Sequence, residues 1–218
     1  AGVAISWNSG HVVNAGYKPY AGPSSGFSIG IRLGESKTRF TTGLTLERVG
    51  YSMRDSSDSY YRYAGSDHLS YYVDTHTSSD YAVIPALLSL SIGEKDFLSL
   101  STGPWFSARL NSQCRGLAVN ENEAGGYYRR TEITVNDDIT EFIRRNDFGW
   151  MIGADLSVPL RNGTGLYLGL KFRQGLTETM NRESAGIPDD TLEKQIFMRN
   201  SVVSLHAGLT VPVFKTVR

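Results

Sequence analysis

Apolar and polar residues alternate with a period of two along several segments of this chain. In the clearest segment, Asp147 to Leu160, the even positions are mostly large and apolar, and the odd positions are mostly small or polar. The next segment, Gly165 to Leu176, repeats the pattern. A period of two indicates a β-strand with two different faces. Residues 161–164 separate the two segments and have Asn-Gly at their centre, so the pair predicts a β-hairpin.

The same alternation, in a less regular form, predicts six further strands. They lie in residues 2–7, 27–33, 40–47, 81–92, 97–110 and 201–214. Together with the hairpin, the chain is expected to form eight strands of a single all-β domain over residues 1–218.

The second face of these strands indicates which side is buried. It consists mostly of Gly, Ser, Thr and Ala with a few isolated charges. The water-facing side of a soluble sheet is instead rich in Lys, Glu, Asp and Arg. We therefore expect the apolar face to contact lipid and the small polar face to line a narrow interior, as in outer-membrane barrels.

The links between the predicted strands alternate between short and long. Short links follow the second, fourth and sixth strands, at residues 34–36, 93–96 and 161–164. Long links cover roughly residues 8–25, 52–80, 111–146 and 177–200. This alternation is typical of periplasmic turns and extracellular loops. The sequence predicts an eight-stranded antiparallel up-and-down transmembrane β-barrel with short periplasmic turns and long extracellular loops.

Composition narrows the alternatives. The apolar share is 40% and the mean hydropathy is -0.26. The longest run without polar side chains, Tyr81 to Leu88, is far shorter than the roughly 18 residues of a spanning helix. Lys plus Arg and Asp plus Glu number 22 each, so we expect no nucleic-acid partner. The chain starts at Ala1 without a leader-like segment, which suggests a removed signal peptide or a shortened chain.

Six short segments occur in an order that resembles a known family. They are residues 26–30, 42–44, 81–88, 101–106, 147–154 and 173–177. In this order they resemble the PorT-like outer-membrane β-barrel family of Bacteroidetes. The resemblance implies a monomeric eight-stranded barrel in the bacterial outer membrane, related to proteins of which some serve secretion or gliding. It brings no catalytic residues to this chain.

The first candidate site is the polar interior. The isolated charges and the histidine on the second face are Arg32, Glu47, Arg109, Asp155, Lys171, Arg173 and His206. An eight-stranded barrel is just wide enough inside to be filled by side chains. We expect these groups to neutralise one another as a structural network; a permeable path is the alternative.

The second candidate site is a tyrosine-rich segment. Seven of the 12 tyrosines lie between Tyr51 and Tyr81, among Ser, Asp, Gly and His. Such a mixture is typical of binding loops. The predicted binding residues are Tyr60, Tyr61, Tyr63, His68, Tyr71 and Tyr72. Alternatively, the inner tyrosines extend the strands above the bilayer and the outer ones form an interfacial aromatic belt.

The remaining features predict little chemistry. Residues 137–145 have acids first, bases last and apolar residues at helical spacing, which predicts a short amphipathic helix. Cys114 is expected to be an ordinary loop residue. No nucleophile, phosphate or zinc motif occurs, so we expect no enzyme, catalytic residue, metal or cofactor.

The sequence thus predicts a non-enzymatic envelope protein with a structural, accessory or binding role. Its expected partners are outer-membrane lipids and either an envelope protein or an extracellular ligand. The alternative is a soluble lipocalin-like calyx for a small apolar ligand, in which the apolar faces point inward.

Overall fold

The computed structural model describes most of the chain. The described residues are 2–9, 16–34, 36–61, 67–93, 97–124, 127–160, 164–177, 179 and 199–211. The strands are β1 (Gly2–Ser9), β2 (Gly16–Arg32), β3 (Thr38–Tyr61), β4 (Asp67–Ile92), β5 (Leu98–Ala124), β6 (Tyr127–Asp138), β7 (Asn146–Pro159), β8 (Gly165–Gly175) and β9 (Arg199–Thr210). A short 3₁₀ helix, η1 (Thr140–Phe142), connects β6 to β7.

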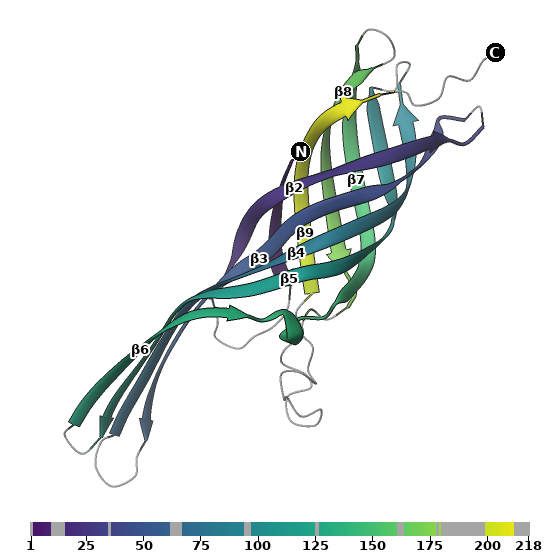
Figure 1. Ribbon diagram of the computed structural model, residues 1–218. Coiled ribbons are helices and arrows are strands. Elements are labelled where there is room, and N and C mark those ends of the chain that lie inside the picture. Colours follow the sequence, from purple (N-terminus) through teal and green to yellow (C-terminus); the bar gives the residue numbers. More distant parts are fainter. Residues whose placement is uncertain are drawn as a thin grey trace.

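Eight of these strands pair in a closed ring. Each neighbouring pair is antiparallel, in the order β1, β2, β3, β4, β5, β7, β8, β9 and back to β1. Figure 1 shows this ring as a barrel. The predicted hairpin is confirmed, since Pro159 of β7 lies opposite Gly165 of β8. The ninth strand, β6, lies outside the ring and pairs with β5.

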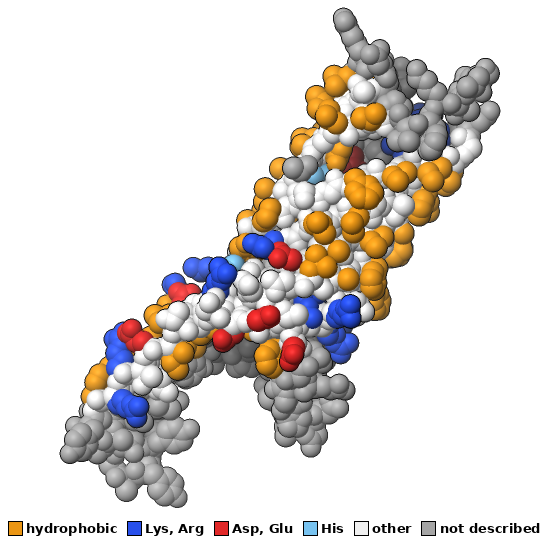
Figure 2. Space-filling view, viewed as in Figure 1, with side chains coloured by type: hydrophobic (Ala, Val, Ile, Leu, Met, Phe, Trp, Pro, Cys, Tyr) orange, Lys and Arg blue, Asp and Glu red, His pale blue; other side chains and the backbone are white. Residues whose placement is uncertain are grey.

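The apolar faces of the ring strands point outward. Phe27, Ile152 and Leu170 are 63%, 52% and 52% exposed. Figure 2 shows hydrophobic side chains over the visible face of the barrel, while charged side chains gather toward the lower left, at the end of the molecule where β6 lies. We call this apolar surface the belt. The prediction that the apolar face is outside is confirmed, and the calyx alternative, which needs that face inside, receives no support.

The interior is less polar than expected. Polar side chains such as Ser101 and Ser107 are buried there, but so is an apolar cluster. The cluster comprises Ala4, Val49, Tyr81, Val83, Leu87, Trp105, Met151 and Val202. Val83, Leu87 and Met151 interrupt the alternation of their strands because they fill the lumen beside the polar groups.

Two of the predicted long loops are wrong. β3, β4 and β5 have 24, 26 and 27 residues, so residues 52–61, 67–80 and 111–124 are strand. With β6 they form a four-stranded sheet that extends beyond the ring (Figure 1). We call this sheet, residues 51–61, 67–80, 111–124 and 127–138, the arm. Its strands pair through polar residues on both faces, so no hydropathy alternation marks them in the sequence.

The other predicted links also change. β2 begins at Gly16, so much of the first long link is strand as well. Most of residues 177–200 lie outside the described residues. The predicted helix at residues 137–145 is wrong: its first residues end β6, and only η1 is helical. Among the described segments there is no helix that is long and apolar enough to cross a membrane.

Candidate functional site

A buried ion pair lies in the lumen. Glu47 of β3 and Arg173 of β8 face each other across the barrel interior, and both side chains are 5% exposed. The Arg173 guanidinium also stacks on Trp105 of β5, with its Cζ 4.7 Å from the ring centroid. Cation–π contact and ion pairing together place one charge between a carboxylate and an aromatic face. This arrangement ties three ring strands together from the inside.

Gly149 of β7 makes room for Trp105. A Cβ atom at this position would lie 2.9 Å from Trp105 Cζ2 and 1.9 Å from the Gln174 carbonyl oxygen. The indole N–H of Trp105 donates to the Trp150 carbonyl at 3.2 Å. The glycines of the inner face therefore leave space for the large side chains that fill the lumen.

Gly149→Ala is expected to destabilise the barrel by about 1–3 kcal/mol, because the added methyl overlaps the Gln174 backbone, which cannot rotate away. Urea unfolding in lipid vesicles measures the change in free energy of unfolding. The matched control is Gly165→Ala, whose Cβ would lie 3.3 Å from its nearest atom, the Val158 carbonyl oxygen. Equal losses in the two variants would contradict the packing role of Gly149.

A second pair lies nearer the short turns. His206 Nε2 of β9 is 3.4 Å from Asp155 Oδ1 of β7. A cavity of about 70 Å³ lies beside Glu47, Arg173 and His206, and its lining also includes Lys171 and Ser204. Ligand pockets are usually about 300–1,000 Å³. The cavity is therefore of a size for a few water molecules and too small for an organic ligand.

Polar contacts also lie at the end of the lumen toward the arm. Arg109 of β5 donates from Nη1 to the Ile143 carbonyl at 2.6 Å and to the Thr140 carbonyl, which holds η1 at the barrel end. Asp147 of β7 accepts a hydrogen bond from Asn200 Nδ2 at 3.1 Å and another from Thr177. Both side chains therefore have partners within the chain, as a structural network requires.

The structure brings together only part of the predicted interior set. Glu47 pairs with Arg173, Asp155 with His206, and Lys171 lines the same cavity. Arg109 binds backbone carbonyls instead of an acid. Arg32 is exposed at the end of β2, where it lies opposite Arg39.

Sequence reasoning missed three buried participants in the lumen. Trp105, Tyr81 and Asp147 are 3%, 2% and 4% exposed. All three lie at odd-numbered positions of the predicted strands, and Tyr81 and Asp147 are the first residues of theirs. The odd positions form the inward face, so the alternation of the two faces was a usable signal for them. Which of them meets which partner depends on strand stagger, and the sequence does not show the stagger.

Cross-strand ion pairs lie in the arm and at its junction with the barrel. Arg48 of β3 makes a two-pronged contact with Asp80 of β4, at 2.7 Å from Nε and 2.9 Å from Nη2. Farther out, Arg54 Nε donates to Asp74 at 3.0 Å and Tyr72 donates to the same carboxylate at 3.0 Å. These bonds to Asp74 hold its pKa below the ordinary value. Opposite charges in facing positions stabilise adjacent strands, which explains how a polar segment forms long strands.

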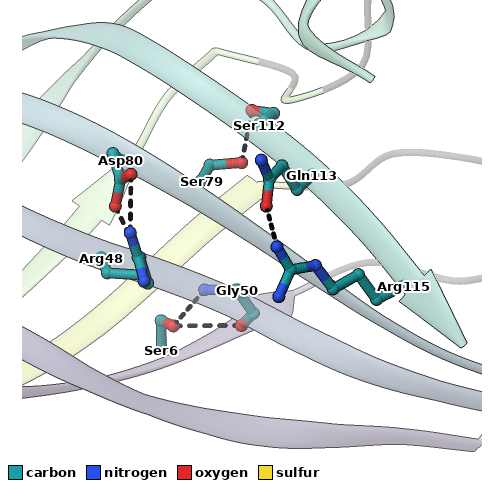
Figure 3. A network of polar contacts seen from close by, with 8 residues as sticks. All are labelled: Ser6, Arg48, Gly50, Ser79, Asp80, Ser112, Gln113 and Arg115. Atoms are coloured by element: carbon teal, nitrogen blue, oxygen red, sulfur yellow. Dashed lines mark hydrogen bonds and ion pairs between the residues drawn. The ribbon is translucent and has the colours of Figure 1, made fainter. Parts of the chain in front are cut away.

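Polar contacts also mark the point where the barrel continues into the arm. The β2–β3 register is interrupted between Pro19 and Ser24. There the Ser6 hydroxyl accepts from the Gly50 N–H at 2.7 Å and donates to the Gly50 carbonyl at 3.0 Å, replacing the missing ladder bonds. Figure 3 shows this contact together with the hydrogen bond between the hydroxyls of Ser79 and Ser112, whose oxygen atoms are 2.6 Å apart.

The predicted tyrosine site falls on the arm. Tyr72 is half-buried on β4 and donates to Asp74. The backbones of Tyr60, Tyr61, His68 and Tyr71 belong to β3 and β4, which agrees with the alternative of extended strands; their side chains lie outside the described part. Tyr63 lies outside the described residues altogether.

A metal centre and a reactive thiol are the remaining kinds of site to consider. Within the described ranges, no group of three or more His, Cys, Asp or Glu side chains could hold a metal ion. Cys114 is a free, half-buried thiol on β5 of the arm.

Comparison with known proteins agrees with the ring and the outward apolar belt. No curated protein and no solved structure matches the chain. A family model described as outer membrane protein beta-barrel domain matches residues 1–181, well over half of the chain. The chain therefore belongs to the outer membrane protein beta-barrel domain family.

Proposed function

We propose that this chain is a small integral protein of the bacterial outer membrane that spans the bilayer as an eight-stranded barrel. It serves the envelope as a non-enzymatic structural or accessory protein, and its arm presents a binding surface outside the membrane. The observation that carries this proposal is the belt, since an apolar outer surface on a closed β-ring suits lipid and not water.

The dimensions of the ring support a spanning role. A strand that crosses a bilayer at a tilt needs about 9–11 residues. β8 has 11 residues and β9 has 12, which is close to one crossing. β4 and β5, with 26 and 27 residues, are long enough to cross and to continue well beyond the headgroups. The short links at the other end then lie on the periplasmic side.

The charged groups of the lumen support a structural role for the barrel. The two interior acids predicted from the sequence, Glu47 and Asp155, lie beside interior bases. The arm, by contrast, places charges and tyrosines on an extended surface away from the belt. Binding activity is therefore assigned to the arm and not to the lumen.

The finer family placement is also a proposal. The segments that resemble, in their order along the chain, the PorT-like barrels of Bacteroidetes include residues 81–88 and 147–154. These residues lie in the second half of β4 and in β7. This placement suggests a partner within a secretion or envelope assembly.

Quenching of Trp150 fluorescence tests the membrane location. Trp150 is 52% exposed in the belt, whereas Trp105 is 3% exposed in the lumen. In vesicles whose acyl chains carry bromine, we expect strong quenching of the wild type. In a Trp7→Phe background, Trp150→Phe should lose most of the quenching, because the remaining Trp105 is screened by the barrel wall. Equal quenching of Trp7→Phe with and without Trp150→Phe would contradict the lipid contact of the belt.

A further inference from the structure

Among the described residues, the arm has two open edges: β6, and residues 55–61 of β3, which extend beyond the pairing of β3 with β2. Among the described residues, β6 pairs along one side with β5, and its other side meets no strand. Natural proteins protect an open edge by keeping it short or by placing charged side chains, a proline or a bulge on it. β6 is 12 residues long and contains no proline, and its charged side chains are of both signs. Its unpaired N–H and C=O groups are therefore available to a strand whose charges complement those of β6.

The charges along this edge are distributed unevenly. β6 begins with Tyr-Tyr-Arg-Arg and ends with Asn-Asp-Asp. Arg129 and Arg130 thus lie at the tip of the arm, and Asp137 and Asp138 lie at its base. If β6 meets a second β6 in the antiparallel direction, the basic end of each strand faces the acidic end of the other. We propose that this edge binds a second copy of the same chain by antiparallel β6–β6 pairing.

One antiparallel register pairs β6 with the second β6 from residue 128 to residue 138 without placing like charges opposite each other. With Ile133 opposite Ile133 of the second copy, Arg129 faces Asp137 twice, once on each side of the symmetry axis. Thr131 then faces Val135. Ile133 is 56% exposed, so its self-contact removes an apolar side chain from water.

The other face of the paired strands is compatible with this register. Tyr128 would face Asp138, Arg130 would face Asn136, and Glu132 would face Thr134, so no like charges oppose each other directly. Arg130 and Glu132 also keep their bond within one chain, 2.9 Å from Nε to Oε1.

Other arrangements fit less well. A parallel pair in register would place Arg129 beside Arg129 and Asp137 beside Asp137, and like charges in such positions are destabilising. In an antiparallel register shifted by one residue, odd positions of one β6 would lie opposite even positions of the other. The face that carries Ile133 in one arm would then be continuous with the opposite face of the second arm. The Ile133-centred register keeps odd opposite odd, so the two arms join into one continuous sheet.

The joined arms leave both barrels intact. Because the tip of one arm lies against the base of the other, the barrels stand at opposite ends of the shared sheet and point in opposite directions. Two barrels joined in this way span two facing bilayers and not the same one. The ring of each barrel is complete within its own chain, so the expected monomeric barrel is retained. This inference goes beyond the proposed function, because it names the partner of the arm.

Charge reversal tests the pairing in detergent solution with the full chain. Arg129→Asp would oppose Asp to Asp, and Asp137→Arg would oppose Arg to Arg, so each variant alone should dimerise about tenfold more weakly or worse than the wild type. A mixture of the two variants restores both Arg–Asp contacts and should form heterodimers with near wild-type affinity. Sedimentation of differently labelled chains measures all three states.

Cross-linking tests the register. In a Cys114→Ser background, Ile133→Cys should form a disulfide dimer on oxidation, because directly opposed strand residues are about 4.5–5.5 Å apart between Cα atoms. Thr131→Cys is the matched control, since its two copies would lie roughly 13 Å apart. More dimer from residue 133 than from residue 131 supports the register.

A monomeric wild type at all concentrations, or mixed charge variants that stay apart, would overturn the proposal. Equal cross-linking at positions 131 and 133 would overturn the register. None of these results affects Trp150 quenching, so failure of the dimer is distinguishable from failure of the membrane proposal.

Discussion

Arg173→Met is expected to lower the free energy of unfolding by about 3–5 kcal/mol, the usual cost of leaving one partner of a buried ion pair alone. Glu47 is buried in the lumen, and its carboxylate would keep its desolvation cost without the guanidinium beside it. The variant also loses the stacking of Arg173 on Trp105. Urea unfolding in lipid vesicles, followed by tryptophan fluorescence, measures the loss.

The double variant Glu47→Leu with Arg173→Met is the control for this prediction. Replacing both charges by apolar side chains of similar size is often neutral or stabilising. We therefore expect the double variant to recover most of the stability lost by Arg173→Met. If it unfolds as easily as the single variant, the two charges are not energetically coupled and the pair does not stabilise the lumen.

Leu170→Arg is expected to cost about 2–4 kcal/mol when the barrel folds into a bilayer. Leu170 is the middle residue of β8 and points outward in the belt, 52% exposed. A guanidinium at this depth must either leave water or draw water into the hydrocarbon region. The same unfolding measurement in vesicles reports the cost.

Leu166→Arg is the matched control, because it lies on the same face near the end of the same strand and is 48% exposed. Near the headgroups an arginine costs only roughly 0–1 kcal/mol. On a water-facing surface both changes would stay within about 0.5 kcal/mol. A difference between the two positions therefore reports membrane depth, and equal small effects would refute a lipid-facing belt.

The orientation of the strands was predictable because the belt is periodic. In β7 the outward positions include Phe148, Trp150 and Ile152, and each is about half exposed as expected. A residue that breaks the period, such as Met151, was harder to interpret. It is 6% exposed because it helps to fill the lumen, which no count of alternating positions reveals.

The arm was not predictable from hydropathy. Its strands are held by contacts such as Arg54 with Asp74, which join positions 20 residues apart. Both faces are polar, so strand and loop look alike in the sequence. The tyrosine-rich composition pointed to a surface segment, but only the register shows that the segment is a sheet with an open edge.

The lumen contacts were predictable in kind but not in detail. Isolated charges on the inner faces indicated a buried network, and Glu47 with Arg173 is such a contact. Arg109 had the same signal, yet it binds the carbonyls near η1. Stagger between strands decides these partners, and it depends on the closure of the whole ring.

The continuity of β3, β4 and β5 through barrel and arm has a mechanical consequence. Bonds between strands lie perpendicular to the strand direction. A pull on the arm tip therefore loads long rows of these bonds together in shear, instead of opening them one after another. The barrel and the arm therefore resist such a pull as one mechanical unit.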